Sequence, residues 1–120
     1  MITVLLVFVG GAMGAPLRYL TDRWVQIHHV LRFPLGTLIV NLVGCFVAGV
    51  VAGGVAQAGW SGDVQALLGT GLCGGLTTYS TFSVETIELL QSKLTIRAVS
   101  YVLTSVGLGV GLAALGWAIP

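Results

Sequence analysis

The sequence predicts an all-α integral membrane protein, with four transmembrane helices in a single domain at residues 1–120. Of the 120 residues, 56% are hydrophobic and only 8% are charged, and the mean hydropathy is +1.00. Such a composition is far from that of soluble domains and requires an apolar solvent. The charged residues leave four uncharged runs, at 2–17, 33–62, 64–84 and 98–120. Each run is near the ~20 residues that a helix needs to cross ~30 Å of hydrocarbon. We therefore expect spans at about 2–24, 33–57, 64–90 and 97–119, joined by short loops.

The first span has the shortest uncharged run, and Arg18 can lengthen it. A long cationic side chain can reach the membrane surface while its stem stays in apolar surroundings, which would place Tyr19, Leu20 and Trp24 at the interface. A signal peptide is disfavoured, because no Lys or Arg precedes the apolar run and no small-residue cleavage pattern is followed by a soluble domain. Arg18 is either an anion-attracting charge at the mouth of a pathway or an interfacial anchor.

The second span contains an amide near its middle, Asn41, within the run GTLIVNLVG at 36–44. An amide in hydrocarbon must find a partner. One interpretation is an interhelical hydrogen bond, which typically contributes ~0.6 kcal/mol. The other is that the Asn41 NH2 group faces a pathway and donates to an anion, with Thr37, one turn earlier, on the same face.

The third span contains the run GLCGGLTTYSTF at 71–82, which is rich in glycine and hydroxyl groups. Lipid offers no water to freed backbone groups, so a broken helix at membrane depth survives only where protein or a water-filled path supplies partners. We expect a break bracketed by Gly74 and Thr77. Carbonyls released at such a break bind Na+ in several transporters, and water or a neighbouring side chain is the alternative partner.

Beyond the expected break, aromatic and acidic side chains follow at helical spacing. Tyr79 and Phe82 lie three residues apart and present their rings on one face of a resumed helix. Such rings often pack in a core or face lipid, but their edges carry positive partial charge and could stabilise a small anion. Hydroxyl groups follow nearby, including that of Thr81. Glu85 is either part of a pore mouth or at a solvated helix end.

Each of the four spans, including the fourth, carries glycines four residues apart, a spacing that lets helix backbones approach closely. The pairs are Gly10 with Gly14, Gly49 with Gly53, Gly71 with Gly75, and Gly107 with Gly111. Four helices are too few to hold both a core and a separate pore, so we infer that the working unit is an oligomer.

The positive charges lie on one side of the predicted spans. Arg23 and Arg32 in the first loop share that side with Lys93 and Arg97 in the third loop, which by the positive-inside rule places both termini outside the cytoplasm.

Several functions are excluded or disfavoured. The net charge of +1 gives no basis for a nucleic-acid partner. Cys45 and Cys73 fall in apolar runs of different spans and are expected to be small core residues. The sequence shows no paired carboxylates at catalytic spacing and no phosphate-binding loop, so we do not expect an enzyme.

Three segments together resemble the CrcB/Fluc family of fluoride channels. They are GGAMGAPLRY at 10–19, GTLIVNLVGCF at 36–46 and GGLTTYSTF at 74–82. The resemblance spans the first three helices in order and spacing, and the fourth contributes mainly Tyr101.

The resemblance implies a passive fluoride-specific channel that exports cytoplasmic fluoride across the plasma membrane of a prokaryote. It implies an antiparallel dimer with a broken third helix and a structural sodium ion at the dimer centre, held by the backbone carbonyls of Gly74 and Thr77. The implied fluoride pathway, with Arg18 at its mouth, is lined by Asn41, Tyr79, Phe82, Thr37, Thr81, Glu85 and Tyr101.

Two features depart from the family pattern. Tyr79 stands where the family usually has phenylalanine, and its hydroxyl could alter the permeation rate. The one-sided Lys/Arg distribution is similar to that of members encoded as pairs, so an antiparallel homodimer and a heterodimer with an oppositely oriented paralogue both remain open.

Two other functions are alternatives to the channel. A small proton-coupled multidrug exporter has a similar length but needs a carboxylate within its first span, where this chain has none. A membrane assembly subunit that transports nothing would use the glycine pairs and Asn41 for packing alone.

Overall fold

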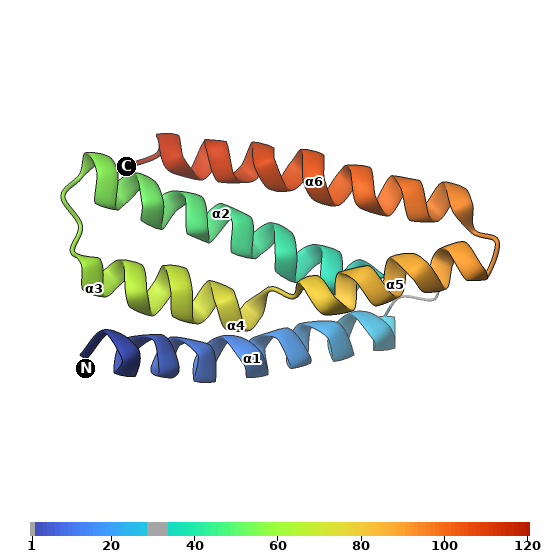
Figure 1. Ribbon diagram of the computed structural model, residues 1–120, viewed down its shortest axis with the longest axis horizontal. Helices are drawn as coiled ribbons and strands as arrows, with labels where there is room; N and C mark the ends of the chain where they lie inside the picture. Colours follow the sequence, from blue (N-terminus) through green and yellow to red (C-terminus); the bar gives the residue numbers. More distant parts are fainter. Residues whose placement is uncertain (1, 29–33) are drawn as a thin grey trace.

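The computed structural model describes residues 2–28 and 34–120, and these are helical apart from short connections. Three long helices, α1 (Ile2–His28), α2 (Leu35–Gln57) and α6 (Thr95–Ala118), lie along the long axis of an elongated bundle of 48 × 27 × 23 Å (Figure 1). Each is long and apolar enough to cross a membrane. The two termini lie at the same end of the bundle.

The chain between α2 and α6 is helical but divided. It begins with α3 (Gly62–Val64), continues through the π-helical segment η1 (Gln65–Cys73) into α4 (Gly74–Leu76), and resumes as α5 (Tyr79–Gln91). The π-helix, in which hydrogen bonds join residues five apart, is rare and usually limited to single turns. Nothing in the sequence analysis anticipated η1.

Extended backbone separates α4 from α5. Thr77 has φ −85° and ψ 161°, and Thr78 has φ −151° and ψ 125°. The glycine pair at 74 and 75 predicted a break bracketed by Gly74 and Thr77, but Gly74–Leu76 is α-helical, so the predicted start of the break was wrong by three residues. The helix restarts at Tyr79 because Thr78 caps it, with the Thr78 hydroxyl accepting from the Thr81 N–H at 3.2 Å.

Glycines set the closest helix contacts, although not in every span. A Cβ on Gly10 or Gly14 of α1 would collide with backbone of η1 and α4, and a Cβ on Gly49 or Gly53 of α2 would collide with backbone of α6. In α6, by contrast, a Cβ on either glycine of the expected pair, Gly107 or Gly111, would meet nothing within 4 Å, whereas a Cβ on Gly116 would meet α2 backbone.

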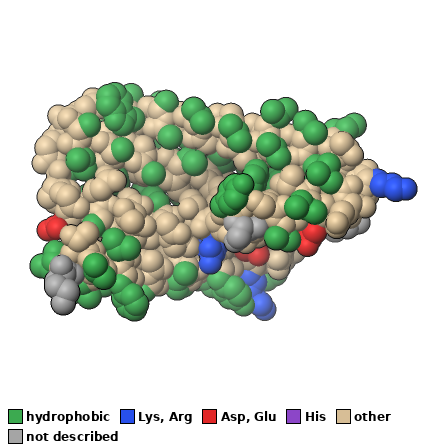
Figure 2. All heavy atoms as spheres, in the orientation of Figure 1, with side chains coloured by type: hydrophobic (Ala, Val, Ile, Leu, Met, Phe, Trp, Pro, Cys, Tyr) green, Lys and Arg blue, Asp and Glu red, His purple; other side chains and the backbone are tan. Residues whose placement is uncertain are grey.

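The described positive charges avoid one end of the bundle. The α1 end near Arg23 and the α5–α6 connection at Lys93 lie at the end opposite the termini (Figure 1). In the view of Figure 2, no Lys or Arg side chain lies at the end that holds the termini, and hydrophobic side chains are spread along the whole face. Arg32 and Phe33, which the sequence analysis placed in the first loop and at the start of the second span, lie outside the described residues.

Candidate functional site

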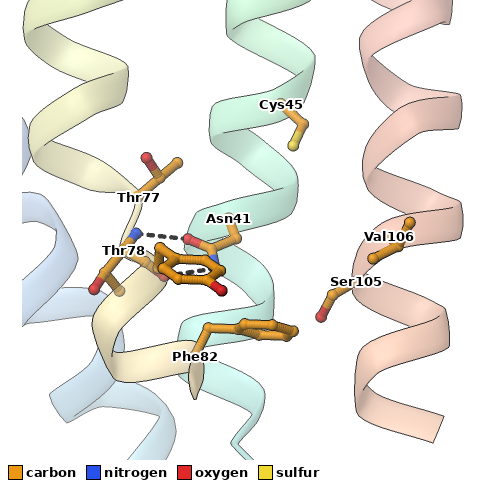
Figure 3. Close-up of a pocket in the computed structure, with 8 residues that line it drawn as sticks. Asn41, Cys45, Thr77, Thr78, Phe82, Ser105 and Val106 are labelled. Atoms are coloured by element: carbon orange, nitrogen blue, oxygen red, sulfur yellow. Dashed lines mark hydrogen bonds between the residues drawn. The ribbon is translucent and has the colours of Figure 1, made fainter. Parts of the chain in front are cut away.

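The break in the third segment is held by one side chain of α2. The Asn41 Nδ2 donates to the Thr78 carbonyl oxygen at 3.1 Å, and the Thr78 N–H donates to Asn41 Oδ1 at 2.8 Å (Figure 3). Because the two partners are complementary, they fix the orientation of the amide, whose flip would set donor against donor and acceptor against acceptor. We call this pair of hydrogen bonds the Asn41–Thr78 clamp.

The clamp replaces a hydrogen bond that a continuous α-helix would supply. In an α-helix the Thr78 N–H would donate to the carbonyl four residues earlier, that of Gly74. It donates instead to Asn41, so the chain can leave the helix here without losing that hydrogen bond. The amide has a further N–H, and Asn41 also lines a pocket. The packing and the donor interpretations of Asn41 are therefore compatible.

A pocket of about 360 Å³ lies beside the clamp, between α2, the break and α6. We call it the inner pocket, and it is lined by Asn41, Cys45, Thr77, Thr78, Tyr79, Phe82, Ser105 and Val106. Phe82 packs against Tyr101, with ring centroids 5.0 Å apart and planes tilted by 45°. Tyr79 lies 6.3 Å from Phe82 by ring centroids, and 81% of Tyr79 is exposed in this single chain. The inner pocket combines ring edges with amide and hydroxyl groups.

The inner pocket includes Ser105, a residue that the sequence analysis missed. Its hydroxyl is buried and has no hydrogen-bond partner among the described residues, and Figure 3 shows it pointing from α6 toward Phe82. Ser105 follows Tyr101 by four residues, which places both on one face of α6. That spacing was the available signal.

A second, smaller pocket of about 210 Å³ lies on the side of the break nearer the first loop. We call it the outer pocket, and it is lined by Ala15, Arg18, Tyr19, Asp22, Gly36, Thr37, Val40, Thr78 and Thr81. Thr78 lines both pockets. The clamp therefore lies between the outer pocket, which is lined by charged side chains, and the inner pocket, which is not.

The remaining predicted pathway residues adjoin these pockets. The Thr37 hydroxyl, on a residue only 4% exposed, donates to Glu85 Oε1 at 2.5 Å. Tyr101 is fully buried and contacts Phe82, as described above. The structure thus brings Glu85 to the outer pocket through Thr37, and Tyr101 to the inner pocket through Phe82.

The backbone oxygens expected to hold a cation differ in their surroundings. The Arg18 Nη1 donates to the Thr77 carbonyl at 3.4 Å, so this oxygen already attracts a positive group. Gly74 stands on an open face where a Cβ would meet nothing within 4 Å, and the clamp turns away the N–H that would cover its carbonyl. Gly74 therefore fits a small cation bound by backbone oxygens, whereas the Thr77 carbonyl fits one only when Arg18 has left it. Among the described residues, no group of three His, Cys, Asp or Glu side chains could hold a metal.

Comparison with known proteins places the chain in one family. The sequence profile described as "CrcB-like protein, Camphor Resistance (CrcB)" matches residues 5–117. A Rhodococcus jostii protein named "Fluoride-specific ion channel FluC 2" is 49% identical over 115 residues, which are 96% of each chain. A Streptomyces avermitilis protein named "Fluoride-specific ion channel FluC 1" is 47% identical over 93% of this chain and 90% of its own. "Fluoride-specific ion channel FluC" of Oceanobacillus iheyensis is 44% identical over 94% of this chain and 87% of its own.

Proposed function

The chain belongs to the CrcB/Fluc family, and from that premise we propose that it is a fluoride channel of the cell membrane and not an enzyme. The observation that carries the proposal is the inner pocket, where the Asn41 amide, the Ser105 hydroxyl and the Phe82 ring meet beside a helix break. These groups are the kind that can replace water around a small anion, because N–H and O–H groups donate to it and ring edges carry positive partial charge.

We place the fluoride path along the two pockets. Arg18 attracts the anion into the outer pocket, and the Thr81 hydroxyl receives it there, whereas Thr37 lines the pocket but donates its single O–H to Glu85. Past the clamp, the path continues along Asn41, Phe82 and the α6 face that carries Tyr101 and Ser105. The Glu85 carboxyl group accepts a hydrogen bond from the Thr37 hydroxyl and so fixes the orientation of that hydroxyl. Tyr79, at the open side of the inner pocket, completes the aromatic pair.

The direction of transport follows from the membrane potential. With the cytoplasm negative, a conducted anion moves outward, and the driving free energy is ~2.3 kcal/mol per charge per 100 mV. A channel therefore relieves fluoride toxicity without coupling to ATP or protons. The proposed path passes both sides of the break, so the break must lie within the membrane. We therefore propose that the segment from α3 to α5 is a third, broken transmembrane span.

The working unit is proposed to be an antiparallel dimer. The inner pocket lies open at the strongly exposed Tyr79, and Gly107 and Gly111 of α6 offer open space to a close helix contact. The one-sided positive charges orient both termini outside the cytoplasm, so the partner is either a second copy inserted the other way or an oppositely oriented paralogue.

A structural sodium ion is proposed at the dimer centre, bound by the carbonyl oxygens of Gly74 and Thr77. The exposed position of Gly74 supports this assignment, which also requires the Arg18 guanidinium to leave the Thr77 carbonyl that it contacts in the single chain. When bound, the ion would neutralise the negative partial charges of these carbonyl oxygens. Replacing Na+ by N-methylglucamine is expected to lower the unfolding temperature of the purified dimer, and an unchanged value would remove sodium from the proposal.

Reconstitution tests the channel itself. Liposomes loaded with potassium fluoride and containing the purified chain, alone or with a paralogue encoded beside it, are expected to release fluoride only after valinomycin provides a path for K+. A fluoride electrode measures the release. No release under either condition would refute the channel, and release without valinomycin would indicate coupled transport instead of conduction.

A further inference from the structure

The outer pocket contains an acidic residue that has no role in the proposed fluoride path. Asp22 lines it together with Arg18, and the two residues lie four apart on α1, so Asp22 is one turn, ~6 Å, nearer the first loop. An anion that enters from the first-loop side passes Asp22 before it reaches Arg18.

The two opposite charges do not neutralise each other by pairing. Among the described residues, no ion pair joins Arg18 to Asp22, and each side chain has its own partner. The Arg18 guanidinium reaches inward to the Thr77 carbonyl at 3.4 Å. The Asp22 carboxylate accepts from Gln26 Nε2 at 3.1 Å and lies against Gly36, near the start of α2. The carboxylate therefore remains a separate negative charge at the outer end of the pocket.

We propose that Asp22 sets the rate at which anions enter the outer pocket, by lowering the local anion concentration that Arg18 would otherwise create. The argument rests on the fluoride path proposed above. A unit charge ~10 Å from an ion changes the local concentration of that ion about two- to fivefold when the effective dielectric constant lies between those of water and of a protein surface. Because Asp22 is only partly buried, dissolved salt screens this effect over a Debye length of ~10 Å at 0.1 M.

Salt dependence distinguishes this electrostatic role from a structural one. In liposomes with fluoride well below saturation, Asp22→Asn is expected to conduct about two- to fivefold faster than wild type at 10 mM ionic strength. The difference should disappear at about 0.5 M inert salt. Asp22→Glu, which keeps the charge, should retain the wild-type salt dependence. Asp63→Asn removes an exposed acid at the other end of the bundle and serves as the matched control, with flux unchanged at both salt concentrations.

The outcomes separate the inference from the channel proposal. If wild type conducts and Asp22→Asn matches it at both ionic strengths, the inference is wrong and the channel stands. A flux that falls in Asp22→Asn equally at low and high salt would also overturn it, because loss of packing does not depend on screening. Absence of flux in wild type would instead refute the proposed function.

Discussion

Substitution of Asn41 tests whether this residue both holds the break and donates to the ion. Asn41→Ala removes both hydrogen bonds to Thr78. Interhelical hydrogen bonds in membranes average ~0.6 kcal/mol and reach ~1.7 kcal/mol, so the loss of two should destabilise the protein by about 1 to 3 kcal/mol. Loss of the remaining N–H removes a hydrogen bond to a charged ion, worth about 1.5–3 kcal/mol, which corresponds to about 10- to 150-fold slower permeation.

Asn41→Asp separates these two contributions. A protonated carboxyl can donate to the Thr78 carbonyl and accept from its N–H, and an ionised one keeps only the acceptor. In neither state does an N–H remain for the ion. If the second donor matters, Asn41→Asp should therefore conduct as slowly as Asn41→Ala, or more slowly, while it keeps more of the stability and the dimer.

Two measurements are needed for each Asn41 variant. The initial rate of valinomycin-dependent fluoride release from liposomes gives the permeation rate, and the unfolding midpoint in detergent gives the stability. Wild-type flux in Asn41→Asp would refute the donor role and return Asn41 to packing alone. Unchanged stability in Asn41→Ala would refute the clamp.

Three further substitutions test the packing and the inner pocket. Gly14→Ala should destabilise the bundle by about 1–3 kcal/mol because its Cβ collides with backbone of η1 and α4, whereas Gly62→Ala, in open space, should leave the stability unchanged; equal unfolding midpoints would contradict the packing. Ser105→Ala should slow fluoride release about tenfold through loss of a buried donor, with the exposed Ser100→Ala as its control, and equal rates in the two variants would remove Ser105 from the path. Tyr79→Phe should keep fluoride release within a few-fold of wild type, since the ring edge is retained; loss of flux in an intact dimer would assign an essential role to the hydroxyl.

Local sequence patterns predicted the features that depend on local chemistry. The uncharged runs predicted α1, α2 and α6, because hydropathy over ~20 residues alone determines whether a helix can remain in lipid. The spacing of Gly10 and Gly14 predicted a close backbone contact, which the structure confirms. The same spacing at Gly107 and Gly111 meets no helix of this chain, because a glycine pair permits close approach without specifying a partner.

Features that depend on distant residues could not be predicted in this way. The position of the break is set by Asn41, which lies 37 residues before Thr78, and the glycines at 74 and 75 gave a misleading local signal. Arg18 contacts the Thr77 carbonyl across 59 residues of sequence, and no local rule relates the two. Likewise, the composition of Gln65–Cys73 is that of an ordinary apolar helix and does not predict the π-helical geometry of this segment.

The clamp connects the proposed cation site with the proposed anion path. Because the Thr78 N–H donates to Asn41, it is not available to the Gly74 carbonyl, which we propose to bind the cation. The same two bonds fix where α5 begins, and therefore where Tyr79 and Phe82 present their rings. A cation that binds the freed carbonyl should then favour the clamped backbone over a continuous helix, since it binds only one of the two. A sodium ion at the proposed site would then act on permeation through the geometry of the break, without contact with fluoride.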